Sequence, residues 1–477
     1  MLPSTLGPTK SPISYVPTTK APAGQPSVTT TGAPAVVTTN FDVIIIGAGI
    51  AGLTAAKQLI ASNKKVIILE ARNRTGGRMY TDYSGTNFSV EMGAGWVQNY
   101  DTRYNPTIAL YQNLGLKDIS FDWNNAKYYN FDGTTDNQND DATDKSILAT
   151  VTSKQSGYSL SVDMYTAINA ITPWSSLSDY DKAELYAGVE EEYGAPLELL
   201  SAKYWNTEGK PGYSDTERIM SQGYSALINK MAAGLNIRRN KVVRSVDYTS
   251  SSTVQVSATD GTVYTAPKVL ITVPLGVLKK GSITFNPPLP STKTGAISKL
   301  GMGVLNHVCL QFPRGTLTRN GVGTIEYMQK NPSTKIQSSY NGRGFVEIIT
   351  YYHTKRLDVI CGEAPANFGS SIESLDDASI VNLLMYELKE CLPNLPNPIA
   401  QKISRWNQDP YSYGSYSYIP INAANTDRQT LAAPVNQQLY FAGEATCVNY
   451  PALVQGGYSS GLREACNILG GTNCASC

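Results

Sequence analysis

Histidine, net charge and long apolar runs are all scarce in this sequence. The chain has two histidines in 477 residues, and its 39 basic residues nearly balance its 38 acidic ones, which leaves a net charge of +1. This balance excludes the basic footprint of a nucleic-acid-binding protein. No apolar run reaches the roughly 18–20 residues of a membrane-spanning helix, and no peroxisomal address such as Ser-Lys-Leu is present. We therefore expect no nucleic-acid partner and no membrane span.

The first forty residues have little with which to build a core. They include the stretch TTKAPAGQPSVTTTGAPAVVTT, which is rich in Thr, Pro and Ala, so residues 1–40 are predicted to be disordered. Such a composition resembles an O-glycosylated stalk, and Asn87-Phe88-Ser89 is a glycosylation sequon, which together suggest an extracellular, secreted protein. The opening MLPSTLGPTK lacks the apolar region of a signal peptide, so a cytoplasmic location stays the alternative.

The seven cysteines do not have the spacing of a metal site. Cys474 and Cys477 form a C-x-x-C pair, but a zinc site needs a second pair and a thioredoxin-type motif needs a βαβ context. We predict no metal ligand. Cys309 lies in an apolar run and is predicted to be a buried thiol. If the protein is secreted, a disulfide within the tail, residues 471–477, is expected.

Residues 42–70 have the pattern of a dinucleotide-binding unit. Val43 to Ile46 is an apolar run typical of a parallel strand buried on both faces, and the glycines of GAGIAG follow it at once. A helical apolar spacing in LTAAKQLIAS and a second apolar run, KKVIILE, complete the unit. Gly47 is expected to make the tight turn, and Gly49 to let backbone approach a pyrophosphate. Gly52 is expected to let helix and strand pack closely, and Glu70 to hold a ribose hydroxyl.

The residues after Glu70 indicate which dinucleotide is bound. Residues 70–78 read EARNRTGGR, with a second glycine pair and with arginines at 72, 74 and 78. A nicotinamide enzyme does not need these residues. They fit a second pass of backbone beside the same pyrophosphate, which suggests that FAD is held permanently.

Five blocks in order resemble the flavin-containing amine oxidase family, which includes polyamine oxidases, monoamine oxidases and lysine-specific histone demethylases. They are GAGIAG with EARNRTGGR, EMGAGWV, GYSALINKMAAGLNIRRNKVVRSVDY, VLITVPLGVLK with GMGVLNHVCLQF, and DPYSYGSYSYIP with LYFAGEATCVNYPALVQGGYSSGLREA. The resemblance spans residues 41–470 and is closest in pattern to polyamine oxidases.

The resemblance implies an α/β fold, in which a Rossmann-type FAD-binding domain is interleaved with a substrate domain of mixed sheet plus helices. The FAD domain is expected from residues 41–100, 215–285 and 400–470, and the substrate domain from residues 101–214 and 286–399. Residues 160–200 are helical in pattern, whereas 301–312 and 344–352 look like strands of the mixed sheet.

The family pattern also implies the cofactor contacts. In the family the backbone near Val243 reaches the adenine, and Glu444 lies beside the ribityl chain and pyrophosphate. The helix that begins near Val454 directs its N-terminal amides at the flavin's pyrimidine edge. The predicted cofactor-binding residues are Gly47, Gly49, Ala51, Gly52, Glu70, Ala71, Arg72, Gly77, Arg78, Gly93, Ala94, Gly95, Trp96, Val243, Trp406, Gly443, Glu444 and Val454.

The implied reaction removes a hydride from the carbon next to an amine nitrogen and passes it to the flavin. Dioxygen is then reduced to hydrogen peroxide, and an aldehyde and an amine are released. Tyr416 matches one wall of the family's aromatic cage, and Trp406 lies where a tryptophan often stands near the flavin. Leu453 occupies the other wall, where many relatives have tyrosine, and the adjacent Tyr450 is a candidate to compensate.

Two positions are predicted to line the substrate tunnel. Gln98 stands where polyamine oxidases have glutamate or histidine. The run Glu190-Glu191-Glu192 matches an acidic segment that borders the tunnel for cationic substrates, and Glu192 is the predicted tunnel residue.

The scarce histidine occurs at a distinctive place. In GMGVLNHVCLQF, His307 occupies the position where relatives keep a lysine that holds water near flavin N5. Strand alternation assigns Val308 and Leu310 to the core and His307 to the opposite, more polar face. A neutral imidazole can hold a water, but it does not supply the fixed charge of lysine.

Three alternatives remain beside a polyamine oxidase. An L-amino-acid or other primary-amine oxidase is one, although no substrate-gripping arginine stands in EMGAGWV. A histone demethylase is disfavoured because no chromatin-binding module, basic surface or inserted helical tower is visible. A flavin-binding protein of low turnover is the third, since Gln98 and His307 depart from the family pattern. The sequence does not determine the oligomeric state.

Overall fold

The structure is a computed structural model. It describes residues 41–84, 88–120, 127–129, 134, 142–206, 217–319, 327–330, 343–345, 347–350, 358–472, 474 and 477. The N-terminal segment 1–40 and the sequon residue Asn87 lie outside the described residues, so their predicted disorder and glycosylation stay predictions.

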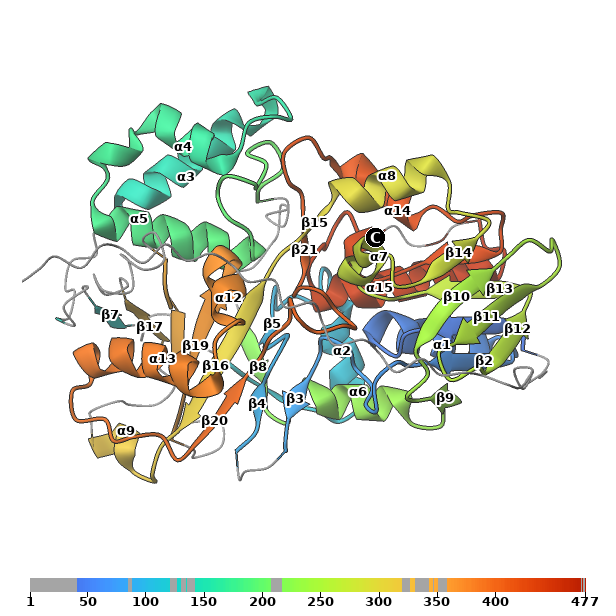
Figure 1. Ribbon diagram of the computed structural model, residues 1–477, viewed down its shortest axis with the longest axis horizontal. Helices are drawn as coiled ribbons and strands as arrows, with labels where there is room; N and C mark the ends of the chain where they lie inside the picture. The colour runs from blue at the N-terminus through green and yellow to red at the C-terminus, as the bar shows by residue number, and fades with distance from the viewer. Residues whose placement is uncertain are drawn as a thin grey trace, which may run out of the picture.

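A five-stranded parallel sheet forms the centre of the nucleotide-binding half. Its order is β22-β13-β1-β2-β9, formed by Leu439–Phe441, Lys268–Ile271, Val43–Ile46, Val66–Leu69 and Ile237–Arg238. Helices α1 (Ile50–Ala61) and α15 (Val454–Ile468) pack together beside it (Figure 1). Alternate residues of β1 enter two different apolar clusters, so this strand is buried on both faces, as its continuous apolar run predicted.

A second sheet and three helices cover the other face. The sheet order is β12-β11-β10-β14, formed by Val263–Ala266, Val254–Ala258, Val243–Asp247 and Thr284–Asn286. Its side chains share one core with the central sheet and with α7 (Leu275–Lys280), α8 (Ser291–Lys299) and α14 (Asn425–Ala432).

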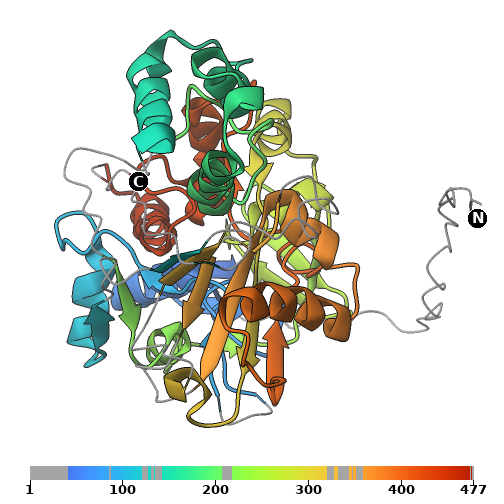
Figure 2. The same cartoon turned by 90° about the vertical axis from the view of Figure 1, so that its left-hand side faces the viewer.

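The other half of the molecule is a six-stranded mixed sheet. Its order is β20-β16-β19-β18-β17-β7, formed by Ala400–Ile403, Leu305–Gln311, Val359–Pro365, Glu347–Thr350, Tyr327–Lys330 and Lys127–Tyr129. Strands β17 and β7 are parallel and the other neighbours are antiparallel. Helices α12 (Ala366–Ile372) and α13 (Asp377–Cys391), in orange, lie against this sheet (Figure 2), and α9 (Thr316–Arg319) lies at its end. Because β20 pairs with β16, residues 400–403 belong to this sheet, although the sequence assigned them to the FAD domain.

A helical layer joins the two halves. It contains α3 (Ala142–Lys154), η2 (Gln155–Gly157), α4 (Met164–Ile171), η3 (Trp174–Ser176), α5 (Asp179–Leu185) and the π-helix η4 (Tyr186–Glu191). The helical pattern predicted for residues 160–200 is confirmed, and Figure 1 shows α3, α4 and α5 as a separate group above the mixed sheet. The remaining elements are β3 (Thr81–Asp82), β4 (Val90–Glu91), β5 (Trp96–Val97), β6 (Asp118–Ser120), β8 (Arg218–Met220), β15 (Gly301–Met302), β21 (Ser417–Tyr418), α2 (Pro106–Asn113), α6 (Tyr224–Ala232) and η5 (Glu444–Thr446).

The cysteines correct two predictions. Cys309 is not a thiol, because the β16–β19 register places it opposite Cys361 and the two form a disulfide. The tail cysteines do not pair with each other. Cys474 bonds Cys466, and Cys477 bonds Cys447, since the tail folds back on α15 and on the loop before it. Cys391 stands outside these three disulfides.

Within the described ranges, no helix has the length and apolar character needed to cross a bilayer.

Candidate active site

A cavity of about 320 Å³ opens at the carboxyl end of β1, at the point where the order of the central sheet reverses direction. This is where open α/β sheets bind ligands, and the volume is in the range of small-molecule sites. Residues of both halves line it, from the glycine turn after β1 to β16 and β19 of the mixed sheet.

The glycine turn has the close packing that the sequence predicted. Gly47 has φ +109°, and a Cβ there would lie 2.6 Å from Thr272 Oγ1. A Cβ on Gly52 would lie 2.2 Å from the Gly47 carbonyl oxygen. Helix α1 therefore starts close to the strand. Its N-cap, Gly49, offers no side chain to its first amides, and amides at a helix N-terminus without a side-chain cap suit a phosphate group.

Glu70 is fixed by the backbone on both of its carboxylate oxygens. Oε2 accepts a hydrogen bond from the Ala48 amide and Oε1 accepts one from the Arg72 amide, each at 2.8 Å. Carboxylate oxygens accept more than one hydrogen bond. Glu70 lines the cavity, so it retains acceptor capacity for a ribose hydroxyl.

The three arginines of EARNRTGGR make different contacts, and not all of them line the cavity. Arg72 forks onto Asp409 with two 2.8 Å bonds, and Arg78 donates to the Ser415 carbonyl and to Glu444. Arg74 is not among the residues that line the cavity. It stacks over Tyr80, and burial, aided by the charge of Arg72, lowers the pKa of Arg74 to about 10. Two of the three arginines therefore reach the cavity, each neutralised by an acid.

Glu444 is the centre of a buried charge network. Its Oε1 accepts from Arg78 at 2.8 Å, and its Oε2 accepts from the Ser417 hydroxyl at 2.6 Å and from the Ala452 amide at 2.9 Å. The fully buried Arg428 donates to the same Ser417 hydroxyl. Burial by itself would raise the pKa of Glu444, but the charges of the two arginines and these hydrogen bonds outweigh it and lower that pKa.

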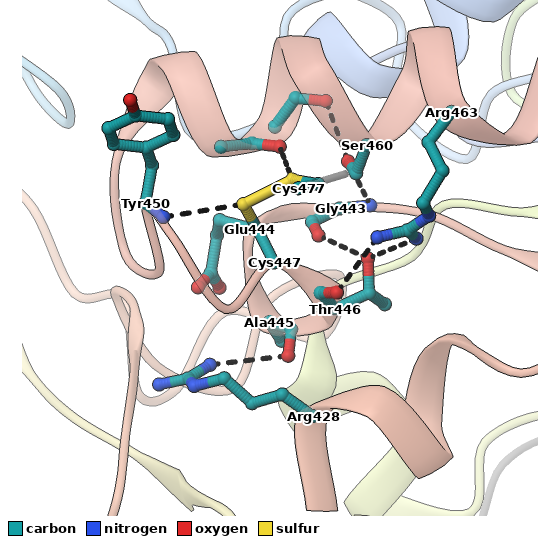
Figure 3. The surroundings of a disulfide bond; sticks show 12 residues. Arg428, Gly443, Glu444, Ala445, Thr446, Cys447, Tyr450, Ser460, Arg463 and Cys477 are labelled. Atoms are coloured by element: carbon teal, nitrogen blue, oxygen red, sulfur yellow. Dashed lines mark hydrogen bonds between the residues drawn. A yellow bond between two sulfur atoms is a disulfide. The ribbon is translucent and has the colours of Figure 1, made fainter. Parts of the chain in front are cut away.

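The loop after Glu444 is held by the tail. Figure 3 shows the disulfide that joins Cys447 of this loop to Cys477 of the C-terminal tail, beside α15, and the Val448 amide donates to the Cys477 carbonyl. The arrangement brings Leu453 and Val454, at the start of α15, to the cavity wall. Tyr450 does not line the cavity, so it does not take the place of the missing aromatic wall at Leu453.

Trp406 packs against the backbone of the EMGAGWV block. The Trp406 indole N–H donates to the Met92 carbonyl at 2.6 Å. A Cβ on Gly93 would lie 3.1 Å from the Trp406 ring, so the ring sits directly on the glycine backbone. Trp96 lines the cavity, and its carbonyl accepts from the hydroxyl of the buried Tyr224.

Residues of the mixed sheet form the opposite wall. His307 lies on β16, is 7% exposed and lines the cavity. Its Nδ1 is 2.8 Å from the Glu91 carbonyl oxygen, and its Nε2 is 3.5 Å from Oε1 of Glu363 on β19. The face that carries His307 is also buried, because Cys309 packs there with Phe88. Glu363 was not predicted from the sequence.

The tunnel residues lie on the same wall. The Tyr416 hydroxyl donates to the Glu191 carbonyl at 2.5 Å, which ties the predicted cage wall to the end of the π-helix. Glu191 and Glu192 line the cavity, as does Gln98. Glu190 instead points into the protein, where it is buried and paired with Arg343 at 2.8 Å.

The structure brings nearly all of the predicted residues to this one cavity. Gly52 lies behind the turn in the packing position described above, and Arg74 and Tyr450 are also outside the cavity lining. The roles of the others stay predictions. Those that line the cavity are Gly47, Gly49, Ala51, Glu70, Ala71, Arg72, Gly77, Arg78, Gly93, Ala94, Gly95, Trp96, Gln98, Glu192, Val243, His307, Trp406, Tyr416, Gly443, Glu444, Leu453 and Val454.

The sequence is described by a family model for flavin containing amine oxidoreductases, which matches residues 50–469. The chain therefore belongs to this family, and FAD is its cofactor. The residues of the cavity fit that cofactor, since the glycine turn, helix amides without a side-chain cap and the carboxylate of Glu70 occur together at the end of β1.

The relatives come from two branches of the family. Human lysine-specific histone demethylase 2 is 32% identical over 90% of this chain, and rice polyamine oxidase 4 is 31% identical over 89% of this chain and 87% of its own length. The chain spans about half the length (53%) of the human demethylase. A solved structure of putrescine oxidase bound to putrescine matches 91% of this chain and 99% of its own with a TM-score of 0.76, at 18% identity. The structural likeness establishes the fold.

Proposed function

We propose that the protein is an FAD-dependent polyamine oxidase, which converts a polyamine of the spermine or spermidine type to an aldehyde and an amine and produces hydrogen peroxide from dioxygen. One observation carries the proposal. The cavity that holds the dinucleotide cradle also includes Glu191 and Glu192, and two carboxylates suit a substrate with several ammonium groups. The similarity to rice polyamine oxidase 4 supports the same reading.

FAD, when bound, would accept the hydride and pass the electrons on to dioxygen. The residues of the chain bind and orient the amine. Tyr416 and Trp406 both line the cavity, and aromatic rings at its wall suit an amine substrate. Glu191 and Glu192 attract the distal ammonium groups. His307 presents its Nε2 edge toward Glu363, where a proton can be held or passed.

The similarity to demethylases supports a second candidate. A methylated lysine side chain is also a secondary or tertiary amine, and human lysine-specific histone demethylase 2 is 32% identical over 90% of this chain. The acidic pair Glu191 and Glu192 would then contact a basic peptide in place of a polyamine.

We also propose that the protein works in an oxidising, extracellular compartment. Three disulfides in the described chain support this, because such bonds are rare in the cytosol. In the denatured, unreduced protein, one of the seven cysteines is expected to react with a thiol reagent. Seven reactive thiols in protein purified from its native source would contradict the proposed compartment.

Peroxide release tests the proposed activity. The purified holoenzyme is incubated in air with spermine, spermidine, their N-acetyl forms, simple monoamines, L-amino acids and a dimethyl-lysine peptide. We expect peroxide with the polyamines. Peroxide with the methylated peptide alone would favour the demethylase reading, and peroxide with L-amino acids alone would overturn both.

A further inference from the structure

We propose that Glu363 is a positioning residue for His307. The two side chains form an ion pair, in which Glu363 keeps the imidazole positively charged at the cavity wall. The dyad places the cation and its carboxylate together at the cavity wall, which both residues line. The structural part of the proposal stands on its own, whereas its kinetic consequence rests on the proposed oxidase function.

The fold fixes the two side chains relative to each other. His307 and Glu363 are direct partners in the antiparallel β16–β19 ladder, and the next pair on the same face is Cys309 and Cys361. That pair is joined by a disulfide. The disulfide fixes the two strands to each other next to the dyad. It therefore helps to maintain the 3.5 Å separation between Nε2 of His307 and Oε1 of Glu363.

The Glu91 carbonyl assigns one of the two ring protons. A carbonyl oxygen only accepts hydrogen bonds, so the Nδ1 atom at 2.8 Å must carry a hydrogen and donate it. The carboxylate of Glu91 faces elsewhere, because it accepts from the Thr81 hydroxyl and the Tyr224 amide. The Glu91 side chain therefore leaves the charge of the imidazole to be set by Glu363.

The surroundings of Glu363 assign the second proton. This carboxyl group is 4% exposed, and its Oε2 has no hydrogen-bond partner among the described residues. His307 is its one ion-pair partner in the described chain. An isolated buried carboxylate facing the lone pair of a neutral ring is strongly unfavourable. A hydrogen on Nε2 makes the ring a cation beside the carboxylate and removes that cost. The imidazole, as the stronger base, keeps this hydrogen.

No other described group competes for this proton. The backbone amide of His307 donates to the Ser404 hydroxyl, and within 4 Å of the imidazole no carboxylate other than Glu363 occurs in the described chain. An imidazolium whose N–H groups face the Glu91 carbonyl and Glu363 places positive charge at the cavity wall. Without Glu363 the ring is expected to be neutral and to lose this effect.

The scarcity of histidine makes the protonation state directly measurable. The FAD-loaded protein labelled with ¹⁵N-histidine contains His307 and His353 alone, and a His353→Gln variant assigns the signals. At a pH of about 8, where a free imidazole is neutral, we expect hydrogens on both nitrogens of His307. In Glu363→Gln we expect a neutral ring with hydrogen on Nδ1, and in Glu363→Asp a return of the second hydrogen. A neutral His307 in the native protein, or an unchanged spectrum in Glu363→Gln, would overturn the proposal.

A kinetic test measures only the reoxidation of the reduced flavin by oxygen. The flavin is reduced chemically with dithionite and mixed with oxygen, so the result does not depend on the amine substrate. Glu363→Gln is expected to slow reoxidation about tenfold. In a His307→Lys background the same change is expected to alter the rate less than about twofold, because lysine carries its own charge. Equal slowing in both backgrounds would show a merely structural role. Failure of every amine to reduce the flavin would instead count against the proposed function.

Discussion

The cradle at β1 and the wall formed by β16 and β19 differ in how many partners their buried carboxylates have. In the cradle, Glu70 accepts two backbone amides and Glu444 accepts three donors, one of them Arg78. At the wall, Glu363 has one partner at 3.5 Å and an oxygen with none among the described residues. The two carboxylates of the cradle are hydrogen-bonded by the protein before any ligand arrives. At the wall, the His307–Glu363 pair has few hydrogen bonds from other described groups to stabilise its charges.

This difference suggests that the cradle serves cofactor binding and the wall serves the reaction. Groups that are fully hydrogen-bonded are held rigidly and orient a cofactor, whereas a sparsely bonded pair can respond when charge changes beside it. We therefore expect changes in the cradle to affect folding and FAD content, and changes at the wall to affect rates.

The largest effect is expected at the glycine turn. Gly52→Ala places a Cβ 2.2 Å from the Gly47 carbonyl, so helix α1 must move away from β1, and we expect loss of FAD and of cooperative unfolding. Gly49→Ala is the matched control, because its nearest neighbour, the Gly76 carbonyl, would be 4.0 Å away. The control is expected to fold with thermal stability near that of the native protein. Normal FAD content in Gly52→Ala would show that the turn is not close-packed.

The next effect is expected at Glu444, and it depends on pH. Glu444→Gln leaves Arg78 and Arg428 without their acid, and we expect it to reduce stability by about 3–5 kcal/mol at pH 7. Because the folded-state pKa is lowered, the stabilisation is present above the ordinary value of 4.5 and is lost as pH falls through the lowered value. Denaturant unfolding of both proteins from pH 7 to pH 3 should show the difference shrinking. A difference that grows toward low pH would refute the direction of the shift.

The wall should be stabilised by its disulfide. Replacement of Cys309 and Cys361 by alanine opens a loop with a sequence separation of 52 residues, and about 2–4 kcal/mol of stability is expected to be lost. Cys391→Ala, outside the three disulfides, is the control, with a change of less than about 1 kcal/mol. Equal losses in the two variants, measured by urea unfolding, would contradict this assignment.

The smallest effect is expected at the tunnel. Glu192 is exposed at the cavity wall, so Glu192→Gln should raise KM for spermine roughly threefold and leave kcat unchanged, as for a rim charge. Added salt should reduce the difference, since exposed charges are screened. A change in kcat, or no salt dependence, would place Glu192 elsewhere in the reaction.

The sequence predicts the glycine turn and the place of Glu70 because these residues are close in the chain. Gly47, Gly52 and Glu70 belong to one strand–helix–strand unit, and its spacing reports its geometry. Glu363 could not be found in this way, because it meets His307 only through the register of β16 with β19. The Cys309–Cys361 bond depends on the same register. The sequence suggested a disulfide between the tail cysteines because they are neighbours in the chain. Their actual partners, Cys466 on α15 and Cys447 in the loop before it, are set by the way the tail folds back.

Anaerobic reduction of the flavin tests the central claim most directly. The holoenzyme is mixed without oxygen with spermidine, and with spermidine deuterated at the carbons next to nitrogen. The proposed oxidase predicts that the yellow absorbance bleaches with both, and more slowly with the deuterated substrate, because the carbon–hydrogen bond is broken in that step. Full FAD content without bleaching by any polyamine would contradict it.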